Sequence, residues 1–418
     1  MKRLTGFGLV LLFLTGLAGA EDRFSLQGYY KNFSIVFKFP RYKSGDTPIS
    51  QPDMGAVTNR LRLKLFFRPS NRLSFQLDYD LSPRIQDRFL FGEEALFGGL
   101  KPLEYRISDF RSRIYPPPEE PVSSFGLFHN VDRFYLTIKT EFADIFVGRQ
   151  AVAWGSARVI NPTDILVPFA FNELDKEERR GVDAVRVKVP LGMMDELDFG
   201  FVAGKDLRWD KNAFFLRGKI YTFRTDLSLL LIAFRKHFLV GVDMARALGG
   251  AGFWVEAAYV IPGFFQESKA SPEKNYVRAS VGADYNLTSK TYGFIEYHFN
   301  SAGRNNPQNY PPLFASSAYQ DGAVYLLGQH YLNLGTTYQL SPLMPVTGLV
   351  ILNLNDRSLV LAPLLEYSVA ENIYLAAGGY LGLGKNPQSI QGLSSPLRLR
   401  SEFGTYPDML FTSFRVYF

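Results

Sequence analysis

The chain has 418 residues, no cysteine, and 46 lysines and arginines against 40 acidic residues. Without cysteine it has no disulfide, thiolate metal site or covalently attached haem, and a formal charge of +6 is too small and too evenly spread to predict nucleic-acid binding. Aromatic residues make up 15% of the chain, a high content that is typical of membrane barrels with aromatic belts at both interfaces.

The first 20 residues have the pattern of a secretory signal peptide. Lys2 and Arg3 form a positively charged start, residues 7–17 are apolar, and small residues at 18–20 precede the expected cleavage after Ala20. The alternative, an N-terminal membrane anchor, is disfavoured because the apolar stretch is shorter than the about 20 residues that span a bilayer. We expect residues 21–418 to form one domain, since no linker or repeat divides them.

Apolar and polar residues alternate through most of this domain, which predicts strands with one apolar and one polar face. In segment 72–81 the apolar face carries Leu73, Phe75, Leu77, Tyr79 and Leu81, and the polar face carries Ser74, Gln76, Asp78 and Asp80. The preceding segment 57–67 alternates in the same way, and a tight turn joins the two. In a transmembrane barrel the apolar face meets lipid and the polar face lines the interior.

We expect about 18 such strands, with about 16 as the alternative count. They are 24–35, 57–67, 72–81, 131–140, 143–151, 182–190, 195–203, 213–223, 226–234, 238–246, 252–260, 276–285, 291–299, 328–340, 346–354, 358–369, 373–383 and 409–418. Every connection after an even-numbered strand is short, whereas the long connections all follow odd-numbered strands. The expected fold is therefore an all-β, antiparallel up-and-down barrel with short periplasmic turns and long extracellular loops.

Charged residues gather at the expected inward positions of two hairpins, with cations on one strand and acids on the next. The expected lumen-lining residues are Arg60, Arg62, Lys64, Asp78, Asp80, Arg186, Lys188, Glu196 and Asp198. Opposite charges on neighbouring strands each contribute about 0.2–1 kcal/mol. Two interpretations stay open: a water-filled lumen whose charges tune ion selectivity, or a wall held by salt bridges in a lumen that loops close.

The connection 152–181 is the most distinctive segment. We expect it to fold into the barrel as a constriction loop, with Trp154 and Phe169 packed on the wall. Arg158 and Asp164 would then project charge into the remaining gap. The alternative is a structured extracellular loop whose tryptophan lies in the interfacial belt, since residues 161–164, Asn-Pro-Thr-Asp, also form ordinary turns.

Short motifs around this loop carry a resemblance to a known group. An arginine–glutamine strand end at 149–150 leads into Trp154-Gly155, then into Asn161-Pro162-Thr163-Asp164, and returns through the charged segment 175–183. In these motifs, and in segments 282–285, 296–300 and 353–356, the chain resembles poorly characterised porin-type outer-membrane proteins of Gram-negative bacteria. The resemblance implies a channel in the outer membrane, without indicating a single substrate.

The last strand ends on an aromatic residue, Phe418, which continues the apolar face of Phe414 and Val416. A terminal phenylalanine on an alternating strand resembles the C-terminal strand of bacterial outer-membrane barrels, where it is the membrane-insertion signal. The resemblance implies that the barrel-assembly machinery and outer-membrane lipid are partners of this chain.

The most economical function is passive passage of small hydrophilic solutes or ions through a charged lumen narrowed by extracellular loops. The four histidines are scattered, without a metal-binding spacing or a nucleophile, so we expect no catalytic residue, metal or cofactor. One alternative is a sheath around a periplasmic multihaem cytochrome, which would carry the haem itself. Another is an exporter of surface polysaccharide, which predicts a lumen of one charge sign. Homo-oligomerisation stays open.

Overall fold

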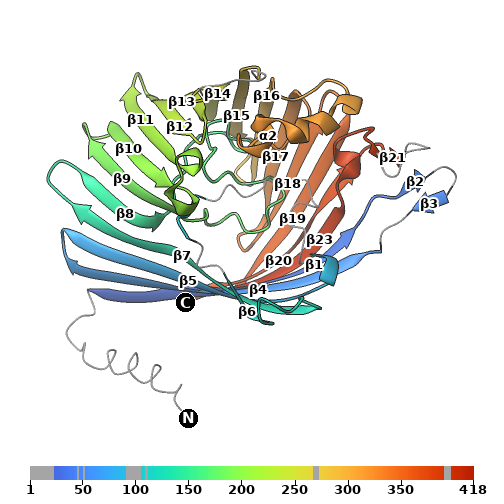
Figure 1. Cartoon of the computed structure of the whole chain (residues 1–418), viewed down its shortest axis with the longest axis horizontal. Coiled ribbons are helices and arrows are strands. Elements are labelled where there is room, and N and C mark those ends of the chain that lie inside the picture. Colours follow the sequence, from blue (N-terminus) through green and yellow to red (C-terminus); the bar gives the residue numbers. More distant parts are fainter. Residues whose placement is uncertain are drawn as a thin grey trace, which may run out of the picture.

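A computed structural model describes residues 23–44, 47–49, 52–90, 105–108, 112–266, 273–389 and 397–418. The predicted signal peptide lies outside the described residues. The main sheet has 19 strands, and all of them except β6 (Ser112–Tyr115) form a closed antiparallel barrel of eighteen strands (Figure 1). The predicted fold and strand number are therefore confirmed.

The barrel strands follow one another in chain order, each paired with the next. They are β1 (Phe24–Lys38), β4 (Met54–Ser70), β5 (Leu73–Gln86), β7 (Phe125–Lys139), β8 (Asp144–Gln150), β9 (Val182–Pro190), β10 (Glu196–Ala203), β11 (Ala213–Thr222), β12 (Thr225–Phe234), β13 (His237–Leu248), β14 (Ala251–Ile261), β15 (Tyr276–Asn286), β16 (Thr291–Asn300), β17 (His330–Ser341), β18 (Met344–Asn353), β19 (Ser358–Ala370), β20 (Ile373–Leu383) and β23 (Asp408–Tyr417). β1 pairs with β23 and closes the ring.

The strands next to the longest loop are longer than predicted. β5 runs to Gln86 and β7 begins at Phe125, so both ends of the stretch predicted as loop 82–130, residues 82–86 and 125–130, belong to the barrel wall. The apolar–polar alternation continues through residues 81–86, but Pro83, which carries no N–H for the ladder, makes the sequence look like the end of a strand there. β6 adds to the far side of β7, beyond the end of β8.

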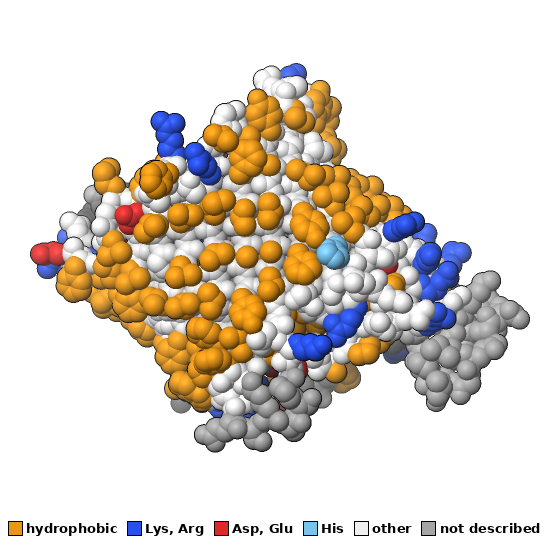
Figure 2. All heavy atoms as spheres, turned by 90° about the horizontal axis from the view of Figure 1, so that it is seen from above, with side chains coloured by type: hydrophobic (Ala, Val, Ile, Leu, Met, Phe, Trp, Pro, Cys, Tyr) orange, Lys and Arg blue, Asp and Glu red, His pale blue; other side chains and the backbone are white. Residues whose placement is uncertain are grey.

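The outer surface of the barrel is apolar. Leu229 of β12 and Val242 of β13 are paired across the sheet, and each is about half exposed, at 52% and 48%. Figure 2 shows parallel rows of such hydrophobic side chains across one face of the wall. An apolar surface of this extent is unfavourable in water and matches the lipid-facing side of a transmembrane barrel.

Within the described ranges, no helix is both long and apolar enough to cross a membrane.

The interior is packed with side chains from the extracellular loops. Tyr105, Trp154 and Leu166 are buried against inward-facing residues of the wall such as Phe215 and Ile232. Short helical turns lie in other loops: η1 (Arg88–Leu90), η2 (Lys205–Leu207), η3 (Trp209–Lys211), η4 (Pro307–Asn309), η5 (Pro311–Ala315), α2 (Ser317–Gln320) and η6 (Phe403–Thr405). A second small sheet combines β2 (Tyr42–Ser44), β3 (Thr47–Ile49), β21 (Gln388–Ser389) and β22 (Leu397–Arg398).

The two chain ends meet at the seam of the barrel. The Gly28 N–H donates to the Phe418 carbonyl at 2.7 Å, and the Phe418 N–H donates to the Gly28 carbonyl at 3.0 Å. A Cβ on residue 28 would lie 2.8 Å from the Phe418 ring, so glycine lets that ring pack flat against the backbone of β1. Phe418 itself is 58% exposed and belongs to the apolar outer surface.

Candidate constriction site

Glu256 of β14 fixes the first part of loop 151–181 to the inner wall. Its carboxylate is fully buried and accepts hydrogen bonds from the Ala157 N–H at 3.0 Å and the Thr163 N–H at 2.8 Å. The Thr163 hydroxyl and the Asn161 amide donate to it as well, at 2.7 and 3.2 Å. The loop backbone thus supplies the donors that a buried carboxylate requires.

Glu296 of β16 holds the same part of the loop from the next pair of strands. This second buried carboxylate accepts from the Arg158 N–H at 2.7 Å and the Ile160 N–H at 3.2 Å. From the wall, the indole of Trp254 and the amide of Asn333 donate to it at 3.0 and 3.1 Å. Two wall glutamates and a short loop segment therefore form one anchored unit inside the barrel.

Trp154 fixes the loop near its start. Its indole N–H donates to Asp198 of β10 at 3.1 Å, and its ring packs on Phe215 with 4.7 Å between centroids. Asp198 is also paired with Arg186 at 2.6 Å, so a predicted cross-strand pair and a loop residue share one carboxylate. Trp154 is 9% exposed, which places it in the packed interior rather than in an interfacial belt.

The second part of the loop lies on the wall formed by β1, β4 and β23. We call residues 175–178 the acidic strap. Asp175 pairs with Lys31 and Arg60 at 2.9 and 3.0 Å, Glu177 pairs with Lys31 and Arg415 at 2.7 and 3.0 Å, and Glu178 pairs with Arg62 and Lys64. Every acid of the strap is therefore matched to cations of the wall.

Two of the strap carboxyls are held in their charged form by this wall. Burial opposes the charge of Asp175, but Lys31 and Arg60 outweigh it and bring the pKa of Asp175 below its usual range. Burial likewise opposes the charge of Glu177, and hydrogen bonds from Lys31 and Tyr417 lower its pKa. The ion pairs that Asp175 and Glu177 make with the wall are therefore intact at neutral pH.

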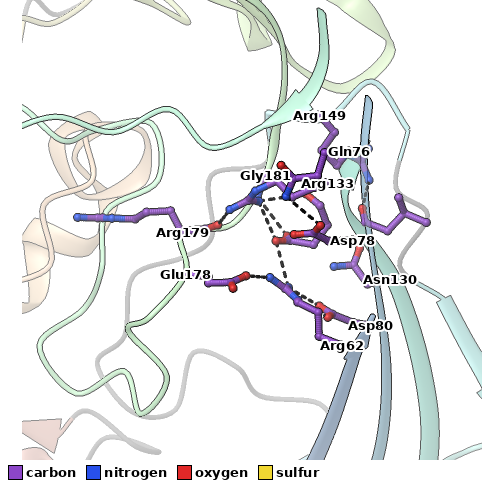
Figure 3. A network of polar contacts seen from close by, with 12 residues as sticks. Arg62, Gln76, Asp78, Asp80, Asn130, Arg133, Arg149, Glu178, Arg179 and Gly181 are labelled. Atoms are coloured by element: carbon purple, nitrogen blue, oxygen red, sulfur yellow. Dashed lines mark hydrogen bonds and ion pairs between the residues drawn. The ribbon is translucent and has the colours of Figure 1, made fainter. Parts of the chain in front are cut away.

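Arg62 is the centre of the largest charged cluster (Figure 3). Its guanidinium makes a two-pronged contact with Asp80 at 2.5 and 2.6 Å and also meets Asp132 at 3.1 Å and Glu178. Figure 3 shows Glu178 reaching from the loop toward Arg62, while the Arg179 side chain points away from the wall. Arg62 is 3% exposed, so this cluster is buried in the packed interior.

The predicted lumen-lining residues fall into two groups. Arg62, Asp78, Asp80 and Asp198 are buried beneath the loop or within ion pairs. The side chains of Arg60, Lys64, Lys188 and Glu196 are 23–40% exposed, and that of Arg186 is 13% exposed. Opposite charges pair across both predicted hairpins, at 2.5 Å for Arg62–Asp80 and 3.2 Å for Lys188–Glu196. The first group fits the interpretation of a wall held by salt bridges. The side chains of the second group keep contact with solvent.

The two charged loop residues, Arg158 and Asp164, differ in their exposure to solvent. Arg158 is half-exposed, pairs with Asp284 at 2.8 Å and lies 5.2 Å from the Trp254 ring centre. Asp164, expected to project into the gap, is instead 1% exposed and pairs with Arg179 at 2.5 Å. Phe169 packs against the same Arg179 guanidinium, 4.0 Å from its ring centre. The turn at 161–164 is folded inward, which directs the aspartate into the loop itself.

The prediction missed the residues that hold the loop. The alternation along the predicted strands places Glu256, Glu296 and Lys31 on the inward face of the barrel. Nothing in the sequence pairs them with loop residues that are 93–146 positions away, because those contacts depend on the closed barrel. The available signal is that Glu256 and Glu296 have no cation directly opposite them on the next strand.

Asp164 makes stability depend on pH. Burial raises its pKa to about 6, although Arg179 acts in the opposite direction. The folded chain therefore holds a proton that the unfolded chain releases near pH 4. The contribution of Asp164 to the free energy of unfolding consequently falls as pH rises from about 4 to 6. Asp164→Asn removes that dependence. The difference between the denaturant midpoints at pH 4 and pH 7 should be smaller for the variant than for the wild type. Equal differences in the two proteins would contradict the assignment of this pH dependence to Asp164.

Gly155 leaves room for the Glu256 anchor. A Cβ there would lie 2.7 Å from both carboxylate oxygens of Glu256, and its φ of +109° favours glycine. We expect Gly155→Ala to displace the first part of the loop and lower the thermal midpoint of the folded barrel. Gly218→Ala is the matched control, since a Cβ at that position meets nothing within 4 Å. Equal midpoints for the two variants would contradict this packing.

Among the residues that the structure describes, no group of three or more histidine and acidic side chains is placed to hold a metal ion.

No protein-family model matches the chain, and a search of curated proteins finds no match. Solved structures share its fold, which is that of porin-type outer-membrane barrels. OccAB2 of Acinetobacter baumannii is 10% identical with a TM-score of 0.53, covering 94% of this chain and 98% of that one. The outer membrane protein OpdK from Pseudomonas aeruginosa is 9% identical with a TM-score of 0.51, covering 96% and 100%. OccK2 (OpdF) of Pseudomonas aeruginosa, solved in complex with glucuronate, is 9% identical with a TM-score of 0.50, covering 95% and 98%.

Proposed function

We propose that this protein is an outer-membrane channel of a Gram-negative bacterium, which lets small hydrophilic solutes or ions cross through a lumen narrowed by loop 151–181. The observation that carries the proposal is the anchoring of this loop inside a closed barrel by Glu256 and Glu296. A loop fixed at several points sets a passage of defined width. The glucuronate bound to OccK2, a small hydrophilic molecule, fits the same class of solute.

Its ion selectivity would come from wall charges that keep contact with solvent. Arg60, Lys64, Lys188 and Glu196 meet that condition and carry mixed signs, which favours modest selectivity. Arg62 supports the wall through its buried ion pairs. Removing the positive charges of Arg60, Arg62 and Lys64 together is expected to shift selectivity toward cations.

Delivery to the membrane would use both ends of the chain. Residues 1–20 would direct export, and the outward-facing Phe414, Val416 and Phe418 of the last strand would be recognised by the barrel-assembly machinery. The pairing of Phe418 with Gly28 supports this role, because it joins the proposed signal to the strand that closes the barrel. Lipid would then surround the apolar face.

The two alternatives gain less support. A cytochrome sheath needs an empty interior, whereas loop residues such as Val152, Ile165 and Leu166 fill this one and are fully buried. A polysaccharide exporter needs a lumen of one sign, whereas cations and acids are matched along this wall. Both features favour a passage for small solutes.

Planar-bilayer recording of the refolded protein tests the proposal. We expect stable conductance steps with modest ion selectivity, and an increase in step size when residues 156–176 are deleted. Folding is checked separately by the shift in gel mobility on heating. A folded barrel that gives no steps, with or without the deletion, would overturn the proposed function.

A further inference from the structure

The three acids of the acidic strap face five cations of the wall, which are Lys31, Arg60, Arg62, Lys64 and Arg415. Lys31 meets both Asp175 and Glu177, while Arg60 meets Asp175 and Lys64 meets Glu178. Arg62, by contrast, keeps the wall carboxylates Asp80 and Asp132 even without the strap. The ion pairs of Lys31, Arg60 and Lys64 are therefore all made with strap acids, and of the three cations Arg60 also lies near the wall carboxylate Asp80.

Lys31 shows this dependence most clearly. Its side chain is 0% exposed, and the carboxylates that meet its ammonium group both come from the strap. Its remaining neighbours include the ring of Tyr29, whose centre is 4.2 Å away. A buried ammonium without an anion is strongly unfavourable. Lys31 therefore requires an anion at this position, from the strap or from elsewhere.

Tyr29 offers a further donor in the same place. It is 2% exposed, and among the described residues its hydroxyl has no hydrogen-bond partner. The cations of Lys31, Lys64 and Arg62 surround its ring at 4.2, 5.5 and 5.7 Å. A buried phenol without a partner, enclosed by cations, is the environment that an additional anionic oxygen would complete.

The strap is held differently from the rest of the loop. Residues 157–163 are fixed through backbone N–H groups that donate to buried carboxylates. The strap is held mainly by side-chain ion pairs, and the side chain of Glu177 is 38% exposed. Side-chain ion pairs with partial exposure exchange readily with dissolved ions, whereas buried backbone contacts do not.

We infer that Tyr29, Lys31, Arg60 and Lys64 form an anion-binding site which the chain occupies with its own strap. The strap acts as a tethered competitor for small molecules that carry two or more carboxylate or phosphate groups. Such a molecule displaces the strap while residues 157–163 stay anchored. This inference rests on the proposed channel function for its role in transport, but the binding itself is independent of conduction.

The test neutralises the strap and measures binding directly. Asp175→Asn, Glu177→Gln and Glu178→Gln are combined, and citrate and pyrophosphate are titrated into the folded, detergent-solubilised barrel by calorimetry. We expect at least a tenfold gain in affinity for one or both probes. The probe that gains more identifies the carboxylate or phosphate preference. The control combines Glu119→Gln, Glu120→Gln and Glu141→Gln, three exposed acids outside the strap.

A further variant shows where the probe binds. Adding Arg60→Gln and Lys64→Gln to the neutralised strap should abolish the gained affinity while leaving the barrel folded, since both side chains are partly exposed. Equal affinities in wild type, control and strap variant would overturn the inference. A gain in binding with no conductance in any variant would leave the anion site standing and reject the channel.

Discussion

Single-channel conductance should rise several-fold when Glu256 and Glu296 are both replaced by alanine. Each carboxyl group accepts hydrogen bonds from the loop backbone in a buried setting, and leaving a buried donor without its partner costs about 1–3 kcal/mol. Losing both acceptors leaves several loop N–H groups in that state, which favours movement of this part of the loop into water. The loop then leaves the lumen and the passage widens.

The measurement compares conductance steps in bilayers at fixed salt concentration. Asp226→Ala is the matched control, because this inward acid pairs with Lys219 of the wall and not with the loop. Access of a thiol reagent to a cysteine placed at Ser156 reports loop release independently, since the chain has no other cysteine. An unchanged step size together with unchanged access would show that other contacts fix the loop.

Replacing Arg62 with alanine should destabilise the folded barrel by about 3–5 kcal/mol, as expected when one partner of a buried ion-pair cluster is removed. Three carboxylates, Asp80, Asp132 and Glu178, converge on this guanidinium. Without it, negative charges are left close together in a region almost without solvent. The cost comes from those charges and not only from the lost contacts.

Unfolding by urea in a defined detergent measures the difference. Arg72→Ala is the control, because Arg72 and its partner Glu141 are 3.7 Å apart and their side chains are 78% and 91% exposed. An exposed pair of this kind contributes about 0–1 kcal/mol. If the two variants lose similar stability, the cluster around Arg62 is better hydrated than its burial indicates.

Most strands of the barrel can be predicted from the alternation of apolar and polar residues alone. Strands such as β9 and β20 have the bounds predicted for them, and most of the others differ by a few residues. Alternation is reliable here because one face must be apolar to meet lipid, which fixes each strand's register. The predicted end of β5 is too early because Pro83 indicates a strand end, although the alternation and the pairing both continue past it.

The interior is less predictable because its contacts join distant segments. Alternation identifies the inward positions of Arg62 and Asp80, and their pairing follows from the hairpin. The positions of Glu178 and Asp164 depend on the path of a loop that has no periodicity of its own. Both are acidic residues of the same loop, yet Glu178 reaches the wall and Asp164 is buried within the loop.

The seam between β1 and β23 has a consequence for how the molecule folds. Its pairs, such as Tyr29 with Tyr417, join residues nearly 400 positions apart, whereas every other neighbouring pair in the barrel is far closer in sequence. Contacts of such separation form slowly, because the whole intervening chain must be ordered first. Until then both outer strands present unpaired edges, which invite aggregation. We therefore expect ring closure to be the slowest step in the formation of this barrel.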